Sequence, residues 1–164
     1  MKASGWSSPE STVCDCCPGS ITCADYSVAM LYRDNNSNIR DDWAGISNNT
    51  GASFTGGIAI DSQNWYLPAC PASGPDGVIV GDTLWSTFMN GVSGMKRVYY
   101  NKSSISAMVG STAIPLTGSI TGLTEQNYPR IATGGNALGI VWTQRVNGND
   151  QCVLRFTAGL DSRK

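Results

Sequence analysis

The sequence predicts an all-β fold built from repeated units of short strands. Apolar and polar residues alternate along three segments, each of which ends in an aromatic residue and follows a turn rich in Gly or Asp: residues 27–32, 82–88 and 136–142. No long segment keeps the spacing of a helix. Only 14% of the 164 residues are charged, and the 19 glycines suit tight turns between short strands.

A repeat runs through the whole chain. Tyr32, Phe88 and Trp142, which end the three segments, lie 56 and 54 residues apart. Two further series of landmarks keep nearly the same spacing: Pro18, Pro75 and Pro129 at the openings of the units, and Trp43, Val98 and Val153 at the start of a following strand. Turns and strands alternate in any β protein, which is the alternative explanation, although loop lengths there scatter widely. A period near 50 residues with four short strands per unit is typical of a propeller blade.

A short motif follows the third strand of the first unit. Ser47, Asn49, Gly51, Ser53 and Phe54 give the pattern S-x-N-x-G-x-S-F, and a weaker copy begins at the serine of position 106. The pattern resembles the Asp box, a hairpin turn of sialidases and related propellers. In that turn an Asx side chain caps backbone amides and Gly takes a positive φ. The resemblance implies a structural role for these residues, away from any active site.

Further motifs extend the resemblance along nearly the whole chain. The pattern CxCCP at residues 14–18 and the pattern CPxxGP at residues 70–75 enclose YRD at residues 32–34 and IRD at residues 39–41. In this order they resemble a group of exported bacterial sialidase-like proteins with BNR (Asp-box) repeats. The resemblance implies a six-bladed β-propeller, of which three units are half. It also implies a secreted or periplasmic location, although residues 1–20 contain no signal peptide.

The repeat divides the chain into the blades of one half-propeller unit. We expect an outer strand at residues 1–13 that completes another blade, blades at 14–57 and 58–116, and an incomplete blade at 117–164. Exchange of the N-terminal strand between two chains would close a six-bladed ring without leaving open strand edges. The sequence therefore predicts a homodimer with two-fold symmetry. The alternative is that the chain is a piece of a longer propeller.

Cysteines are unusually frequent, and three explanations stay open for the six of them: Cys14, Cys16, Cys17, Cys23, Cys70 and Cys152. The first is disulfide bonding, with Cys17 or a neighbour joined to Cys70, which the even count favours. The second is a thiolate site for zinc or copper(I) made by Cys14, Cys16 and Cys70, although the spacing lacks the usual C-x-x-C pair. The third is a set of buried free thiols. We favour disulfides and expect no metal site and no cofactor; a c-type haem would need histidine, which the sequence lacks.

The candidate active-site residues lie around two Arg–Asp pairs. Sialidases bind the substrate carboxylate with arginines and use an aspartate as acid/base. By resemblance, Arg33 and Arg40 would bind substrate, and Asp34 and Asp41 would be the catalytic carboxylates. Trp65, on the connection to the second unit, would add a substrate-binding face. The alternative is that both pairs are surface ion pairs at a turn, which contribute little to stability.

The sialidase pattern is incomplete in this sequence. Only two glutamates, Glu10 and Glu125, are present, and neither forms the expected pair with a tyrosine. The sequence therefore leaves three classes of function: a sialidase-like glycoside hydrolase or its remnant, a non-catalytic carbohydrate-binding module, and a structural propeller unit. A glycan is the expected ligand. A net charge of −1 with scattered basic residues does not predict nucleic-acid binding, and no apolar run is long enough to span a bilayer.

Overall fold

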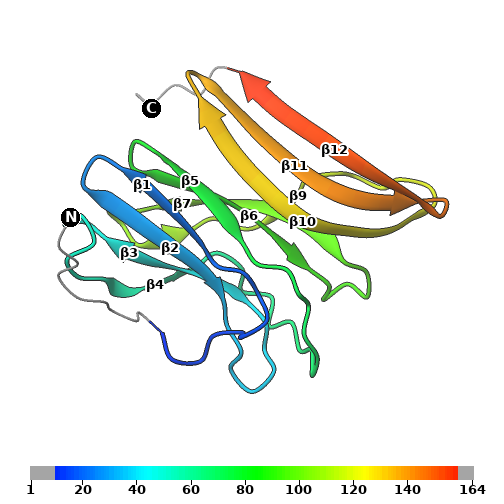
Figure 1. Cartoon of the computed structure of the whole chain (residues 1–164), viewed down its shortest axis with the longest axis horizontal. Helices are drawn as coiled ribbons and strands as arrows, with labels where there is room; N and C mark the ends of the chain where they lie inside the picture. Colours follow the sequence, from blue (N-terminus) through cyan, green and yellow to red (C-terminus); the bar gives the residue numbers. More distant parts are fainter. Residues whose placement is uncertain (1–9, 159–164) are drawn as a thin grey trace.

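The computed structural model describes residues 10–158, and within that range the chain forms three antiparallel β-sheets and no helix (Figure 1). Sheet 1 contains four strands in sequence order: β1 (Ser20–Ala24), β2 (Ser27–Arg33), β3 (Asp42–Ser47) and β4 (Thr55–Ala59). Sheet 2 runs from β5 to β8, with β9 also paired to β7: β5 (Asp76–Val80), β6 (Thr83–Asn90), β7 (Arg97–Ser104), β8 (Val109–Gly110) and β9 (Ile114–Pro115). Sheet 3 contains three strands: β10 (Leu123–Gly134), β11 (Ala137–Val146) and β12 (Asn149–Ala158). The described residues thus contain no helix that could cross a membrane.

The three sheets are arranged in sequence order, with their first strands next to one another. Strand β5 contacts both β1 and β10, so the first strands of the sheets lie side by side and the later strands lie further out. This is how consecutive blades are arranged in a β-propeller, and the described residues form part of one. The predicted all-β fold is therefore confirmed. The three segments with alternating apolar residues correspond to β2, β6 and β11.

The structure refines two details of the predicted repeat. Sheet 1 extends to Ala59, so the expected boundary at residue 57 falls inside β4. Pro129 does not open a unit, because it lies inside β10, where the register shifts between Asn127 and Arg130. Proline cannot donate a ladder hydrogen bond, so a bulge is where a strand tolerates it. Most of the expected N-terminal strand, and the chain beyond residue 158, lie outside the described residues.

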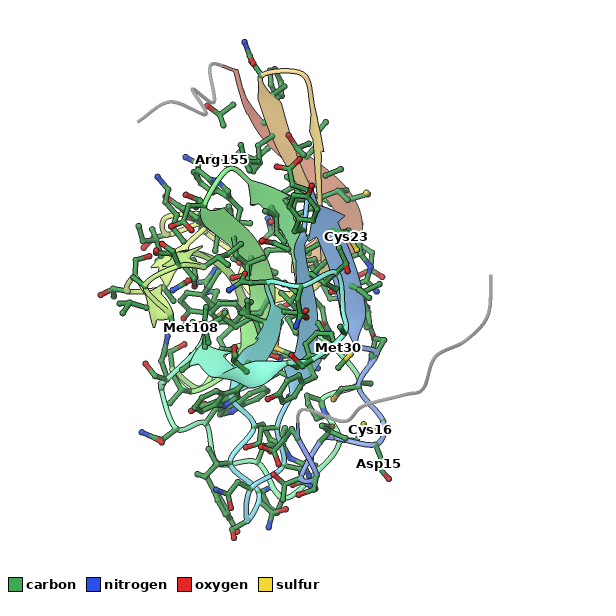
Figure 2. All side chains as sticks on the ribbon, turned by 90° about the vertical axis from the view of Figure 1, so that its left-hand side faces the viewer. Asp15, Cys16, Cys23, Met30, Met108 and Arg155 are labelled. Carbon is green, nitrogen blue, oxygen red and sulfur yellow. A yellow bond between two sulfur atoms is a disulfide. The ribbon has the colours of Figure 1, made fainter. Side chains whose placement is uncertain are left out.

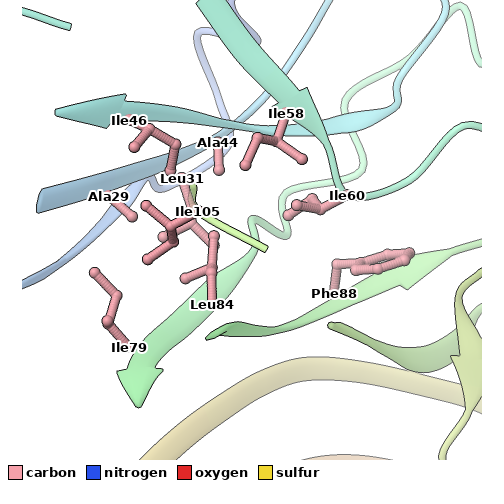
Figure 3. Packing of buried hydrophobic residues seen from close by; sticks show 10 residues of the cluster. All are labelled: Ala29, Leu31, Ala44, Ile46, Ile58, Ile60, Ile79, Leu84, Phe88 and Ile105. Atoms are coloured by element: carbon pink, nitrogen blue, oxygen red, sulfur yellow. The ribbon is translucent and has the colours of Figure 1, made fainter. Parts of the chain in front are cut away.

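Two apolar clusters hold the sheets together. The first joins sheets 1 and 2, and Figure 3 shows its side chains converging between them, with Leu31, Ile46, Leu84 and Phe88 fully buried. The second joins sheets 2 and 3 and includes Trp142, which is 2% exposed. Each cluster forms because alternate residues of a strand point to one face of its sheet. Sheet 2 is therefore packed on both faces.

The turn between β3 and β4 is built by the Asp-box-like motif. Ser47 Oγ accepts a hydrogen bond from the Gly51 amide at 2.9 Å, and Asn49 Oδ1 accepts one from the Ser53 amide at 2.9 Å. Gly51 has a φ of +83°, which glycine adopts without strain. The weaker copy is arranged differently, because the Ser106 amide donates to Asp82 at 2.9 Å, across the sheet.

Candidate functional site

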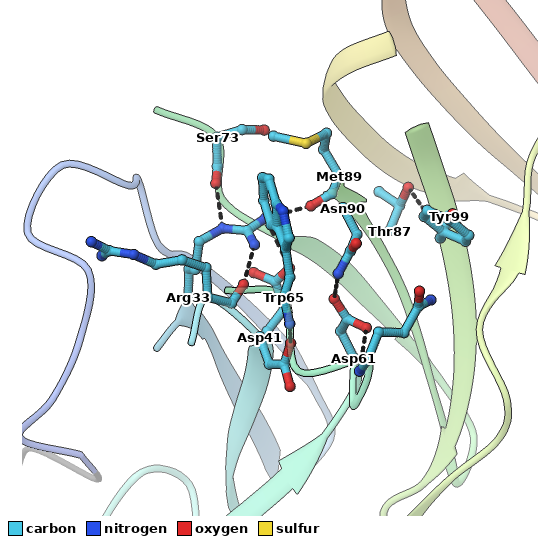
Figure 4. Close-up of polar contacts among 12 residues, drawn as sticks. Arg33, Asp41, Asp61, Trp65, Ser73, Thr87, Met89, Asn90 and Tyr99 are labelled. Carbon is cyan, nitrogen blue, oxygen red and sulfur yellow. Dashed lines mark hydrogen bonds and ion pairs between the residues drawn. The ribbon is translucent and has the colours of Figure 1, made fainter. Parts of the chain in front are cut away.

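Arg33 is the centre of a buried polar cluster, which we call the Arg33 hub. It ends β2 and is 1% exposed. Its Nε donates to the carbonyl of Ser73 at 2.8 Å, its Nη2 donates to the carbonyl of Met89 at 2.6 Å, and its Nη1 donates to the carbonyl of Arg40 (Figure 4). One guanidinium therefore ties sheet 1 to the connection between sheets 1 and 2 and to the end of β6.

Two buried carboxylates complete the hub. Asp42 lies 2.9 Å from Arg33 Nη2, and both side chains are fully buried. Asp61 is 1% exposed and accepts a hydrogen bond from the side-chain amide of Asn90. Neither oxygen of Asp42 has a hydrogen-bond partner, although Oδ2 is in ion-pair contact with Arg33. The hub thus holds more acidic groups than Arg33 alone neutralises.

Burial raises the pKa of both carboxyl groups. Burial raises the pKa of Asp42 well above its ordinary value, and the charge of Arg33 opposes this shift. Burial raises the pKa of Asp61 to about 6, and the hydrogen bond from Asn90 opposes it. Raised carboxyl pKa values occur in general acids, and they also occur in buried structural ion pairs.

Protonation of Asp61 predicts a characteristic pH dependence of stability. The folded state holds this proton up to a pKa of about 6, whereas the unfolded state releases it near the ordinary value. Its contribution to stability is therefore present in acid and is lost as the pH rises through about 6, by about 3 kcal/mol in all. Asp61→Asn should remove this slope while keeping an acceptor for Asn90.

The measurement is urea unfolding at several pH values between 4 and 7, a range of roughly three units around the raised pKa. The difference between wild type and Asp61→Asn isolates this one group from the other carboxylates. Asp25→Asn, at an exposed turn with a φ of +50° that asparagine tolerates, is the matched control and should follow the wild type. Parallel curves for wild type and Asp61→Asn would contradict the assignment.

Asp41 fixes the backbone at Trp65, the residue predicted to stack on a substrate. Its carboxylate accepts the backbone amides of Asn64 and Trp65, each at 3.0 Å. The Trp65 ring lies over the Arg33 guanidinium at 5.5 Å and is only 7% exposed. Trp65 is therefore a packed cover of the hub, and its faces are not presented to a ligand in this structure. The sequence could not show this burial.

Asp34 and Arg40 lie at the margin of the hub. Asp34 accepts hydrogen bonds from the hydroxyl of Thr12 at 2.8 Å and from the Asn35 amide at 2.7 Å. Arg40 is 7% exposed, and its Nε donates to the carbonyl of Leu67 at 3.2 Å. The alternative of surface ion pairs is wrong, because Arg33 and Arg40 are buried and Arg33 pairs with Asp42 across the β2–β3 ladder.

An open pocket of about 490 Å³ lies on sheet 3, and sequence analysis did not identify it. The residues that line it are mostly of polar or charged types: Glu125, Asn127, Tyr128, Thr143, Gln144, Arg145, Asp150, Gln151 and Cys152. We call it the sheet 3 pocket. Tyr128 is 52% exposed and has a φ of +52° at the bulge beside Pro129. A bulge changes the direction of the side chains beside it. The proline within the strand pattern, Pro129, was therefore the sequence signal that could have pointed to this pocket.

The charged groups of the sheet 3 pocket form solvent-exposed ion pairs. Arg145 donates to both carboxylate oxygens of Asp150, at 2.7 and 3.0 Å. The hydrogen bond and charge of Arg145 lower the pKa of Asp150, which keeps that carboxylate ionised. Glu125 pairs with Lys96 at 3.1 Å. The pocket therefore offers oriented acceptors and donors beside an exposed aromatic ring.

The cysteines form one disulfide and four free thiols. Cys16 is bonded to Cys70, which confirms that a neighbour of Cys17 pairs with Cys70. Further disulfides were expected and are not found: the free thiols are Cys14, Cys17, Cys23 and Cys152. Cys23 and Cys152 are exposed on different sheets, which explains why they do not pair with each other. Burial and the Cys14 thiol raise the pKa of Cys17 to about 12, and the charge of Arg33 opposes this shift.

Comparison with known proteins identifies the class of fold. No protein-family model and no curated protein matches the chain. Its structure is similar to GH43B of a xyloglucan PUL of Bacteroides ovatus, with a TM-score of 0.53, 8% identity, and coverage of 85% of this chain and 26% of that chain. It is also similar to an endo-arabinase from Bacteroides thetaiotaomicron VPI-5482, with a TM-score of 0.55, 16% identity, and coverage of 85% and 55%.

These neighbours are β-propeller glycoside hydrolases, and the likeness concerns the fold. The chain spans about a quarter and about half of their lengths, so it corresponds to part of a propeller. They are GH43 proteins, a related propeller group, and not sialidases. The sialidase relationship that the motifs suggest therefore stays a prediction.

Proposed function

We propose that the chain is a glycan-binding β-propeller unit and that the sheet 3 pocket is its ligand site. The observation that carries the proposal is the combination, in one accessible pocket, of the half-exposed Tyr128 ring with the ionised Asp150 and several amide side chains. Sugar hydroxyls both donate and accept hydrogen bonds, and the apolar face of a sugar ring packs on an aromatic side chain. The glycoside hydrolase fold of the structural neighbours supports a glycan as the ligand class.

Binding is favoured over hydrolysis because the carboxyl groups with raised pKa values are buried, whereas the accessible pocket contains none of them. The carboxyl groups with raised pKa values, Asp42 and Asp61, are 0% and 1% exposed. In the accessible pocket, Asp150 has a lowered pKa and is clamped by Arg145. Glycoside hydrolysis requires a general acid that reaches the leaving-group oxygen. Asp34 and Asp41 do not supply it here, because Asp41 holds two backbone amides and Asp34 holds the Thr12 hydroxyl.

Hydrolysis is the second candidate function, and the raised pKa of Asp61 is what favours it. A carboxyl group with a pKa of about 6 is suited to donate a proton near neutral pH. This function would require the Trp65 cover to move and expose the Arg33 hub. Release of reducing sugar from a bound glycan, lost in Asp61→Asn, would support hydrolysis, and binding without turnover would support the first proposal.

The test of binding is a glycan array, followed by calorimetric titration of the best glycan. Tyr128→Ala should weaken binding about tenfold, the loss expected for one aromatic stacking contact. Tyr26→Ala is the matched control, because Tyr26 is 74% exposed and lies in the β1–β2 turn, outside the pocket. Equal affinity of wild type and Tyr128→Ala, or the absence of any bound glycan, would reject the pocket as the site.

We also propose that two copies of the chain close one ring. Sheets 1 and 3 each leave a face without a partner sheet among residues 10–158, and large apolar side chains are exposed there: Ile21 on β1, and Leu154 and Phe156 on β12. Water-exposed apolar patches and open strand edges mark interaction surfaces. An exported location fits the disulfide, since disulfides persist in oxidising compartments.

A further inference from the structure

Four sulfur atoms gather at one end of sheet 1, where Cys16 lies and from which Cys23 is remote (Figure 2). The Sγ atoms of Cys14, Cys16 and Cys17 all lie within 4.8 Å of one another, and those of Cys14 and Cys16 are 3.5 Å apart. Cys70 Sγ is bonded to Cys16 Sγ and therefore belongs to the same group. In a tetrahedral zinc site with Zn–S bonds of 2.3 Å, sulfurs are about 3.8 Å apart.

We propose that reduction of the Cys16–Cys70 disulfide turns these four cysteines into a four-thiolate zinc site. Three of the sulfurs already lie within 4.8 Å of one another, which approaches the spacing of a closed structural site, and the fourth is bonded to one of these three. This site is independent of the glycan pocket on sheet 3 and goes beyond the proposed function.

The backbone around the sulfurs is fixed by the Arg33 hub. The Cys14 amide donates to the Arg33 carbonyl at 2.8 Å, and the Cys17 amide donates to the Cys14 carbonyl at 3.3 Å, which closes a tight turn. On the Cys70 side, the Ser73 carbonyl accepts from Arg33 Nε at 2.8 Å. Preorganisation of this kind is what an engineered or natural metal site requires of its supporting residues.

The two segments also meet in direct contact. A Cβ atom on Gly74 would lie 1.7 Å from the carbonyl oxygen of Pro18, so only glycine allows the segment after Cys70 to pack against the segment after Cys17. This contact does not involve the disulfide. We therefore expect the two segments to stay together when the disulfide is reduced.

The proposed chemistry has two steps, reduction of the disulfide and then binding of zinc. A phosphine reductant and one water molecule break the Cys16–Cys70 S–S bond, giving two thiols and a phosphine oxide. One Zn²⁺ then forms four Zn–S bonds and displaces the four thiol protons into solvent. The oxidised protein has only the thiols of Cys14 and Cys17 at this place and should not hold zinc in a closed site.

The experiment titrates Zn²⁺ into the whole protein against a chromophoric chelator, under anaerobic conditions. Phosphine-reduced wild type should bind one equivalent, and the oxidised protein should bind none. Cys14→Ser and Cys17→Ser should each lose stoichiometric binding. The double variant Cys23→Ser/Cys152→Ser removes two exposed thiols outside the cluster and should bind like the wild type. Co²⁺ in place of Zn²⁺ should give the intense visible bands of tetrahedral thiolate coordination.

Circular dichroism of each reduced variant separates a lost ligand from a lost fold. If reduced wild type is folded and binds no stoichiometric zinc, the proposal is overturned. It is also overturned if Cys17→Ser binds as tightly as wild type, or if binding depends on Cys23 or Cys152. Stoichiometric binding that requires Cys14, Cys17 and reduction together would establish the site.

Discussion

Replacing Arg33 with alanine is expected to lower the free energy of unfolding by about 3–5 kcal/mol. The change leaves Asp42, which is fully buried, without its ion-pair partner. It also removes the donors to the carbonyls of Ser73, Arg40 and Met89, which come from three separate segments. Removing one member of a buried ion pair is costly because the remaining carboxyl group stays desolvated and must either keep an unpaired charge or take up a proton.

Urea unfolding followed by tryptophan fluorescence measures this loss. Arg130→Ala is the matched control, because Arg130 is exposed and bonds only to the neighbouring Pro129 carbonyl, so a change of less than about 0.5 kcal/mol is expected. Arg33→Met combined with Asp42→Asn removes both charges and should recover part of the stability. A loss below about 1 kcal/mol for Arg33→Ala would contradict the central role of the hub.

The fold was largely predictable because it depends on local pattern. Alternation of apolar residues located β2, β6 and β11, since one face of each strand is buried and the period of a strand is two. The position of Pro129 was not predictable from the repeat. Its strand β10 continues through a bulge, and a bulge depends on pairing with β11 that spacing alone does not reveal.

The sequence predicted which residues belong to the candidate site, but not which residues they contact. Arg33 was expected beside Asp34, its neighbour in sequence. In the antiparallel ladder Arg33 stands opposite Asp42, so both side chains point to the same face and the ion pair forms there. Burial of Trp65 depends on its packing against Gly91, where a Cβ atom would lie 2.7 Å from the indole ring. Such long-range contacts are not encoded in any local motif.

Closure of a ring by two copies predicts a mass in solution twice the 17.3 kDa of one chain. The open face of sheet 3 has Leu154 at 64% and Phe156 at 72% exposure, and sheet 1 has Ile21 at 66%. A two-fold axis would place the Leu154–Phe156 part of sheet 3 of each copy against sheet 1 of the other and bury these side chains twice. The sheet 3 pocket lies on the same face but nearer the β11–β12 turn, and in this arrangement it stays outside the joint. Each fully buried side chain of this size contributes about 1.5–3 kcal/mol to association.

Leu154→Asp should therefore convert the dimer to a monomer, because a carboxylate would enter the apolar centre of both joints. Light scattering after size exclusion at low micromolar concentration measures the mass. Val109→Asp is the matched control: Val109 is 61% exposed on β8 of the central sheet, away from both open faces, so this variant should stay dimeric. A monomeric wild type would overturn closure by two copies. The open faces would then be covered by further propeller blades of another chain segment, as the greater length of the GH43 neighbours would suggest.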